Sequence, residues 1–446
     1  MQTWKQIRDR EDGKLSSRTF ANRIKSNRIS DLQLSNHKDI VSSHKGSINS
    51  LQIDFSERRY LLSAASDSTV AVYDIQRATN YEGGGVISKH SSIFVVDKQH
   101  ESGHKYAVSS AIWYPIDTGL FITGSYDHHI NVWDTNTTKV VVNFKMPGKV
   151  YKTAMSTLAT SHMLIAAGTE DVQVRLCDIA SGAFAHTLSG HRDGVMNVEW
   201  STSSEWVLIT GGCDGAIRFW DIRRAGCFLL LDQSRTQLGR RPTILKHSAI
   251  TKALPPQDSS TKLRTAQKKH ANGGGCKQLP IGRVPSKGPM KQRLHPGLLS
   301  TQDRATAHYG AVTGLKVTED GMYLLSTGSD SRLRLWDVES SCDTLVNFET
   351  VRLQTSKPIQ LATAQDSGLV FVPCMRTVKA FDMWSGNTYT TLRGHYECVN
   401  ACWFNQQDQE LYTGGNDRQI LVWSPARSIA DQMDEGADED QDNWSS

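Results

Sequence analysis

The sequence has no pair of cysteines at C-x-x-C spacing, although it contains eight cysteines in 446 residues. Cys398 and Cys402 are four positions apart, and neither has a second Cys or His pair at the spacing of zinc sites. We therefore expect free thiols in a reducing compartment. No apolar run is long enough to cross a bilayer, and the first ten residues are too polar for a signal peptide. These absences predict a cytosolic or nuclear protein with no membrane partner.

The chain also lacks a strong net charge. Its formal charge is +4 and 38% of its residues are hydrophobic, which provides ample core material. So small a charge does not argue for general nucleic-acid binding. Nothing in the sequence implies a cofactor or a metal.

What the chain does contain is a recurring set of one His, one hydroxyl residue, one Asp and one aromatic residue. The step from the His to the middle Asp is 23 or 22 residues, the hydroxyl lies four positions before that Asp, and a closing position follows 7 residues after it. The aromatic residue precedes the closing position, which Ser424 occupies in the last copy. The four complete sets are His104, Thr123, Asp127 and Trp133; His191, Thr210, Asp214 and Trp220; His308, Ser326, Asp330 and Trp336; and His395, Thr413, Asp417 and Trp423. An earlier copy has His44, Ser63, Asp67 and Tyr73.

This pattern resembles the WD40 repeat, and two degenerate copies that close at Asp178 and Asp382 bring the number to seven. A single four-stranded unit cannot bury both faces, so such units stack around an axis. The resemblance implies an all-β, seven-bladed WD40 β-propeller. A His–Ser/Thr–Asp set could also be a catalytic triad, but a catalytic set occurs once and not at a fixed period. We interpret these sets as buried structural tetrads in a protein that is not an enzyme.

The remaining segments divide the chain. Residues 1–30 predict either a short basic amphipathic helix or a frayed, solvated terminus. Residues 31–426 are expected to form the propeller, with residues 31–42 supplying the fourth strand of the last blade. Tyr81–Gly85 marks an extra loop. A basic segment, 237–305, and an acidic tail, 427–446, are expected to be disordered.

The basic segment has three possible roles. It could be a nuclear-import signal, a nucleic-acid contact or a tolerated surface insertion. Direct DNA binding is therefore left open.

The repeat also predicts two faces. In a WD40 blade the loop that carries the His and the turn that carries the middle Asp lie on one rim. The residues that follow the His are candidates for binding a target there: Lys45, Lys105, Tyr106, Arg192, Tyr309 and Tyr396. Trp220 and Asp221 end a strand that runs away from this rim, so Arg223 and Arg224 are predicted on the opposite face.

The W-D-x-R ending at Trp220, Asp221 and Arg223, followed by Arg224, resembles the box that docks WD40 receptors onto the β-propeller adaptor of cullin-4 ubiquitin ligases. Receptors of this type often add an N-terminal helical segment that grips the adaptor. By this resemblance, Phe20 and Ile24 in residues 1–30 are further candidates for adaptor binding.

Five stretches resemble the Cockayne syndrome group A family of WD-repeat proteins: Trp113–Gly119, Trp220–Ala225, Thr344–Asn347, Val370–Pro373 and Asp442–Ser446. The basic segment looks longer than in that family. The resemblance implies a nuclear, non-enzymatic substrate receptor of a cullin-4 RING ligase in transcription-coupled nucleotide excision repair. It also implies a Cockayne group B-like remodeller and stalled RNA polymerase II as partners. The alternative is a WD40 scaffold that binds histones or RNA without a ligase link.

Overall fold

Short strands, nearly all of them in antiparallel pairs, are the main regular elements of the described part of the chain. The structure is a computed structural model that describes residues 2–82, 87–224, 226–233, 306–353, 357–364 and 368–426. The predicted basic insertion, 237–305, and acidic tail, 427–446, lie outside the described residues. Among the described residues, no helix is both long enough and apolar enough to span a bilayer.

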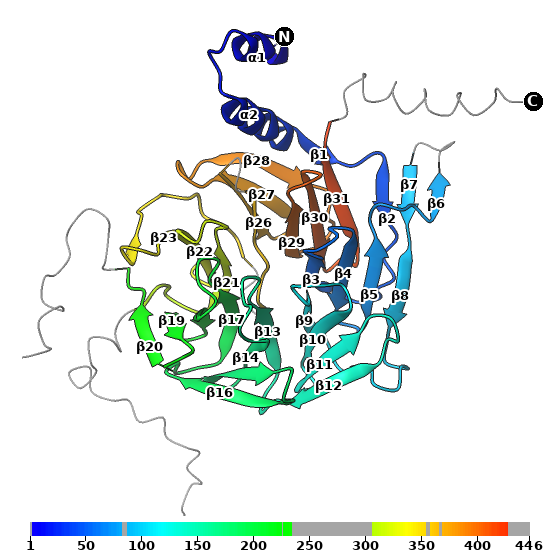
Figure 1. Cartoon of the computed structure of the whole chain (residues 1–446), viewed down its shortest axis with the longest axis vertical. Helices are drawn as coiled ribbons and strands as arrows, with labels where there is room; N and C mark the ends of the chain where they lie inside the picture. Colours follow the sequence, from blue (N-terminus) through cyan, green and yellow to red (C-terminus); the bar gives the residue numbers. More distant parts are fainter. Residues whose placement is uncertain are drawn as a thin grey trace, which may run out of the picture. The chain divides into compact units, whose positions relative to one another are not determined.

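Six sheets are regular blades of four antiparallel strands, which follow one another in chain order from the axis outward (Figure 1). Their inner strands consist largely of buried residues, because each blade packs against a neighbour on both faces. The outer strands are more exposed, and in β12 (Val140–Lys145) residues that are at least partly buried alternate with exposed ones.

The strands of the first three blades are, in blade 1, β3 (Ile48–Ile53), β4 (Tyr60–Ala65), β5 (Val70–Asp74) and β8 (Ser92–Val96); in blade 2, β9 (Val108–Trp113), β10 (Leu120–Ser125), β11 (His129–Asp134) and β12; and in blade 3, β13 (Val150–Met155), β14 (Leu164–Thr169), β15 (Gln173–Asp178) and β16 (Ala183–Ser189). The strands of the next three are, in blade 4, β17 (Val195–Trp200), β18 (Val207–Gly212), β19 (Ile217–Asp221) and β20 (Gly226–Leu230); in blade 5, β21 (Val312–Val317), β22 (Tyr323–Gly328), β23 (Leu333–Asp337) and β24 (Cys342–Asp343); and in blade 6, β25 (Ala362–Ala364), β26 (Leu369–Cys374), β27 (Thr377–Asp382) and β28 (Thr388–Arg393).

The last position in the ring holds a composite sheet of seven strands, which we call the closing sheet. Its C-terminal strands are β29 (Val399–Asn405), β30 (Glu410–Gly415) and β31 (Ile420–Pro425). The N-terminal strands β1 (Leu32–Leu34) and β2 (Lys38–Ile40) both pair with β31, Leu32 opposite Pro425 and Ile40 opposite Ile420. The prediction that residues 31–42 complete the last sheet is therefore confirmed.

The closing sheet differs from the prediction in its outer part. The extra loop predicted at Tyr81–Gly85 belongs to a hairpin of β6 (Asn80–Glu82) and β7 (Ile87–His90). Strand β7 pairs in parallel with β2 and so covers an edge that would otherwise be free. The all-β WD40 propeller is confirmed. Six regular blades are present rather than the predicted seven, because this composite sheet fills the last position.

Two helices precede the sheets, α1 (Gln2–Glu11) and α2 (Ser17–Ser30). Gly13 lies just after the end of α1 with φ +71°, and its backbone N–H donates a hydrogen bond to Arg10 O at 3.1 Å. The Ser16 hydroxyl caps α2 by accepting a hydrogen bond from the N–H of Thr19 at 3.2 Å. Of the two possibilities for residues 1–30, the structure shows the helical one.

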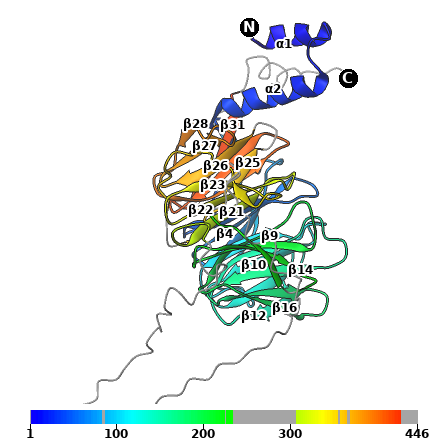
Figure 2. The same ribbon diagram turned by 90° about the vertical axis from the view of Figure 1, so that its left-hand side faces the viewer.

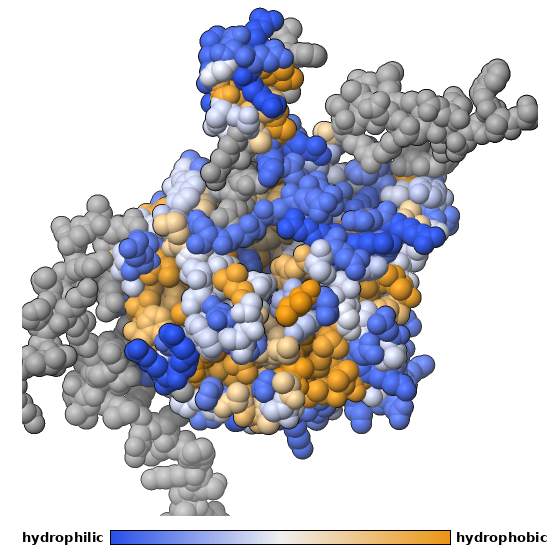
Figure 3. Space-filling view, in the orientation of Figure 1, coloured by the Kyte–Doolittle hydropathy of each residue, from blue (hydrophilic) through white to orange (hydrophobic). Residues whose placement is uncertain are grey.

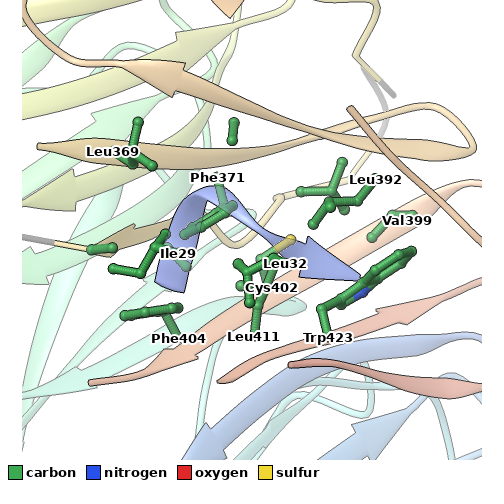
Figure 4. Packing of buried hydrophobic residues seen from close by; sticks show 14 residues of the cluster. Ile29, Leu32, Leu369, Phe371, Leu392, Val399, Cys402, Phe404, Leu411 and Trp423 are labelled. Carbon is green, nitrogen blue, oxygen red and sulfur yellow. The ribbon is translucent and has the colours of Figure 1, made fainter. Parts of the chain in front are cut away.

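The end of α2 is anchored in the core. Ile29 is only 2% exposed and shares a cluster with Leu32, Phe371, Leu392 and Trp423, at the junction of blade 6 and the closing sheet (Figure 4). The Tyr389 hydroxyl and the Ser30 hydroxyl are 2.5 Å apart in the same place. Figures 1 and 2 both show α2 beside β31. The helical segment is thus attached where the ring closes.

We predict that deleting residues 1–43 lowers the melting temperature by many degrees, because it uncovers β31 and removes Ile29 and Leu32 from the core. Burial of an aliphatic side chain contributes about 1.5–3 kcal/mol, so these two side chains alone contribute roughly 3–6 kcal/mol. Deleting only residues 1–28 keeps both side chains and should leave the melting temperature nearly unchanged. Thermal unfolding of both deletions checks this, and equal melting temperatures for the 1–43 deletion and the full chain would contradict it.

Candidate protein-binding faces

A chain of hydrogen bonds runs through blade 4 from the core to the rim. The indole N–H of Trp220 donates to Thr210 Oγ1 at 2.8 Å, and that hydroxyl lies 2.7 Å from His191 Nε2. His191 Nδ1 is 3.1 Å from Asp214 Oδ1. Every group is satisfied when the hydroxyl donates to Nε2 and the Nδ1–H donates to the carboxylate. The buried imidazole is then neutral and fully paired, as a structural role requires.

The other three complete sets have the same geometry. Their distances from hydroxyl to His Nε2 and from His Nδ1 to carboxylate are 2.7 and 2.8 Å for His104, Thr123 and Asp127; 2.7 and 3.0 Å for His308, Ser326 and Asp330; and 2.8 and 2.8 Å for His395, Thr413 and Asp417. The indoles of Trp133, Trp336 and Trp423 donate to the hydroxyls at 2.7, 2.9 and 2.8 Å. The structure thus brings together all four sets that the spacing predicts.

Blade 1 has a modified set. His44 Nε2 lies 2.5 Å from the Ser63 hydroxyl, but its Nδ1 meets Thr69 Oγ1, which in turn donates to Asp67. Tyr73 accepts a hydrogen bond from the N–H of Ser43 and does not join the chain. Burial lowers the pKa of His44 to about 4, and the charge of Asp67 offsets this only in part.

The middle carboxylate of each set also orients the rim. Asp214 Oδ2 accepts the backbone N–H of Arg192 at 3.0 Å, and Asp330 Oδ2 accepts that of Tyr309 at 3.2 Å. Burial alone would raise the pKa of Asp214, but hydrogen bonds from His191 and from backbone N–H groups hold that pKa below its usual value. The same contact fixes the residue after each His on the rim.

The predicted target-binding residues therefore lie on one rim. Lys45, Lys105 and Tyr396 have backbone N–H groups that donate to Asp67, Asp127 and Asp417 at 2.6, 3.2 and 3.1 Å. Three tyrosines stand out: Tyr106, Tyr309 and Tyr396 are 65, 79 and 75% exposed. Exposed aromatic side chains on a rigid frame are typical of protein-binding surfaces.

The opposite face carries the turn after β19. Arg223 is 57% exposed, yet its guanidinium donates twice to the closing carboxylate, from Nε to Asp221 Oδ1 at 2.9 Å and from Nη2 to Oδ2 at 2.8 Å. Its Cζ also lies 5.5 Å from the ring centroid of Trp206. The adjacent carboxylate and indole thus hold the exposed guanidinium in one position. Arg223 lowers the pKa of Asp221 through the hydrogen bond.

Arg224 has a different position. It is 84% exposed, and its Nε is 3.9 Å from Asp221 Oδ2. Trp220 itself is fully buried and offers no surface to a partner. Of the four residues in the predicted docking box, Arg223 and Arg224 are therefore the accessible ones.

The helical candidates lie in the hairpin of α1 and α2. Phe20 and Ile24 are partly buried, and the Arg10 guanidinium lies 5.2 Å from the centre of the Phe20 ring. In Figure 3 the helical segment shows hydrophobic residues beside strongly hydrophilic ones. Leu32, which follows α2, pairs with Pro425 at the end of β31, and β31 is the third strand of its sheet, as β19 is in blade 4. Third strands run away from the His and Asp rim, so α2 ends on the same face as Arg223.

Comparison with known proteins gives the relationships of the chain. The family described as WD domain, G-beta repeat matches residues 35–74, 97–134, 182–221, 300–337 and 386–424. WD repeat-containing protein ATCSA-1 from Arabidopsis thaliana, a Cockayne syndrome A homologue, is 67% identical over 449 residues, covering 99% of this chain and 100% of the relative. The chain belongs to the Cockayne syndrome group A family of WD-repeat proteins.

More distant relatives of this group A family member match smaller parts. A ribosome biogenesis protein WDR12 homolog from Drosophila erecta is 26% identical over 187 residues, which is 41% of this chain and 43% of the relative. Radiation-sensitive protein 28 from Saccharomyces cerevisiae is 28% identical over 128 residues, which is 27% of this chain and 25% of the relative. WD40 propellers are generally non-catalytic scaffolds, and these matches indicate no catalytic family.

Two of the thiols that the structure describes are poor nucleophiles. The described cysteines are all free, and burial raises the pKa of Cys177 to about 12 and that of Cys213 to about 11. Such thiols do not form thiolate nucleophiles at neutral pH. Within the described ranges, no group of three or more His, Cys, Asp or Glu side chains could hold a metal ion.

Two features escaped the sequence analysis of this group A protein. Trp206, the indole against Arg223, could have been found as an aromatic residue in the connection just before a predicted strand. The second feature is Lys152, which lines the central cavity. It is harder to find in the sequence, because a single lysine in a predicted inner strand does not interrupt the repeat pattern.

We predict that this group A protein loses stability as the pH falls from about 6.5 to about 4. The folded-state pKa of His44 is about 4 and its ordinary value is 6.5, so in this window the unfolded chain binds the proton and the folded chain does not. The loss at the acidic end is about 3 kcal/mol at 1.36 kcal/mol per pH unit. Burial also lowers the pKa of His308, which adds to the loss.

Chemical denaturation across this pH range checks the prediction. The His44→Gln variant should show a shallower slope of stability against pH than the wild type, and the exposed His186→Gln variant should match the wild type. An identical slope in all three proteins would exclude His44 as the source.

Proposed function

We propose that this protein is the substrate-recognition subunit of a cullin-4 RING E3 ubiquitin ligase that acts in transcription-coupled nucleotide excision repair. Membership of the Cockayne syndrome group A family supports the repair setting. One geometric observation carries the docking part of the proposal. The helical hairpin and the turn that holds Asp221 and Arg223 belong to one face, and the tyrosine-bearing rim belongs to the other.

Exposed apolar residues support the choice of docking face. They lie on the face opposite the His and Asp rim, in the connections from first to second strands or from third to fourth strands of the blades: Phe55, Ile116, Leu158, Met322 and Trp384. Apolar side chains on this face would add buried hydrophobic contact when a partner covers them. We infer that the β-propeller adaptor of cullin-4 ligases covers this face, and that cullin-4 and its RING subunit join through the adaptor.

The opposite rim would present the target. Tyr106, Tyr309 and Tyr396 offer large, rigid contact areas, and Lys45, Lys105 and Arg192 add positive charge around them. A Cockayne group B-like remodeller bound there would bring the ligase to stalled RNA polymerase II. The protein would act as a non-catalytic receptor, because each face binds one partner and the ring holds the two at a fixed distance.

A nuclear location is part of the same proposal. Residues 237–305 are rich in Lys and Arg and nearly free of Asp and Glu, a composition typical of nuclear-import signals. A second candidate function is a scaffold without a ligase link. The names of the ribosome biogenesis relatives favour it, since those proteins match 41% of this chain.

We predict that Arg223→Glu weakens binding to the adaptor by tens- to thousands-fold, the range typical when one charged contact at an interface is lost. The variant places a carboxylate beside Asp221 and removes the guanidinium held on Trp206. Arg224→Glu, in the same turn, should have a smaller effect because its side chain is nearly fully exposed. Arg223→Lys keeps the charge but cannot make the bidentate contact with Asp221, so its adaptor affinity should lie between those of the wild type and Arg223→Glu.

Recovery of the adaptor in a pull-down, with melting curves as the folding control, measures the effect. Deleting residues 1–28 in the same assay tests the helical hairpin, which should act together with Arg223. If a folded Arg223→Glu variant recovers the adaptor at the wild-type level, the docking role is wrong. The scaffold alternative then becomes the better explanation.

A further inference from the structure

A cavity of about 400 Å³ lies on the ring axis, lined by inner-strand residues of all six regular blades and of the closing sheet. Phe55, Arg58 and Gln406 line the cavity and follow inner strands at the ends that point away from the His and Asp rim. The cavity therefore opens on the face that carries Arg223. Its volume falls within the range of small-molecule sites, about 300–1,000 Å³. Trp200 and Trp403 provide aromatic walls.

Lys152 lines this cavity from a position where other inner strands carry short side chains. The inner strands β3, β9, β13, β17, β21 and β29 show a register shift near their start, and Lys152 is the first paired residue after the shift in β13. The corresponding residues in other inner strands are Ser50, Asn197, Gly314 and Ala401. A lysine is therefore not needed to build the ring at this position, and a long cation there calls for another explanation.

The charges around Lys152 do not neutralise it. Glu199 is the acidic residue that raises the pKa of Lys152, but its carboxylate already forms an ion pair with Lys316, with Nζ and Oε1 2.8 Å apart. Asp54, also in the lining, accepts backbone hydrogen bonds from Glu57 and Tyr60 at 2.6 and 2.7 Å. Among the residues that the structure describes, none forms a hydrogen bond or ion pair with Lys152 Nζ.

The local electrostatics agree with this geometry. Burial lowers the pKa of Lys152, Glu199 raises it in part, and Lys316 lowers it further. Over the whole lining, Arg58, Lys152 and Lys316 balance Asp54, Glu199 and Glu319, but the groups that act on Lys152 itself are one committed carboxylate and a second ammonium group, which leaves a local excess of one positive charge. Lys152 is partly buried, and a cation that is partly removed from water without a partner is costly, so an anion that enters the cavity would relieve that cost.

We propose that the central cavity binds a carboxylate group, which forms an ion pair with Lys152 while its apolar body packs against Trp200 and Trp403. One negative charge matches the local excess at Lys152, and the aromatic walls favour an apolar or aromatic carrier. A free small carboxylic acid and an acidic side chain of a polypeptide share this chemistry. The proposal concerns the channel alone and does not depend on docking at Arg223.

Calorimetric titration of the full-length protein at pH 7 tests this proposal with two carboxylate probes. The probes are benzoate and a peptide with the sequence of residues 431–446. Benzamide and the same peptide with every Asp and Glu changed to Asn and Gln are the uncharged controls. We expect Lys152→Met to weaken binding of the carboxylate probe by roughly tenfold to a hundredfold, the usual effect of losing a charge-assisted hydrogen bond. Lys152→Arg should retain most of the binding, and the exposed Lys149→Met should match the wild type.

Binding of benzoate but not of the peptide would support a free small acid, and binding of the peptide alone would support a polypeptide carboxylate. Equal binding of the uncharged controls, no binding of either probe, or no effect of Lys152→Met would overturn the proposal. If Lys152→Met does not fold, acylation of Lys152 in the wild type gives a second measurement. Peptide mass spectrometry should then show protection of Lys152 by the bound probe, and equal labelling with and without it would also overturn the proposal.

Discussion

The carboxylate of the middle aspartate in each repeat links the core of the propeller to its surface. In blade 4 it accepts the imidazole N–H of His191 and the backbone N–H of Arg192. The first contact completes the buried chain that ends at Trp220, and the second fixes the exposed residue on the rim. A change in the core of a repeat therefore also displaces the rim residue next to it, because both depend on the same oxygens.

The two faces differ in how they are built. The rim is repeated, since the same hydrogen bonds place Lys45, Lys105, Tyr309 and Tyr396. The face proposed for docking is not repeated: it combines one helical hairpin, one Arg223–Trp206 contact and apolar residues that differ between blades. A repeated surface suits a target that contacts several blades, whereas a surface with single features can specify one orientation of one partner.

The sequence predicts what depends on local spacing and fails where distant segments meet. The His–Ser/Thr–Asp–Trp sets could be read directly, because the repeat length fixes which side chains converge. The parallel pairing of β7 with β2 could not be predicted, since short strands of this kind carry no pattern that selects a partner. The internal ion pair of Arg223 could have been suspected from Asp221, two positions earlier, but its contact with Trp206 depends on the fold of the whole blade. The position of Lys152 in the central cavity could not be predicted, because it depends on how the surrounding inner strands are arranged.

The attachment of strand β1 to β31 has a consequence for biosynthesis. Leu32 is among the first residues of the sheets to leave the ribosome, but its partner Pro425 is among the last of the described residues. The first blades can form during translation, whereas the ring stays open until β31 has been made. Over that interval the apolar residues Ile29 and Leu32 have no native site, which makes the nascent chain a natural client for chaperones that shield hydrophobic segments.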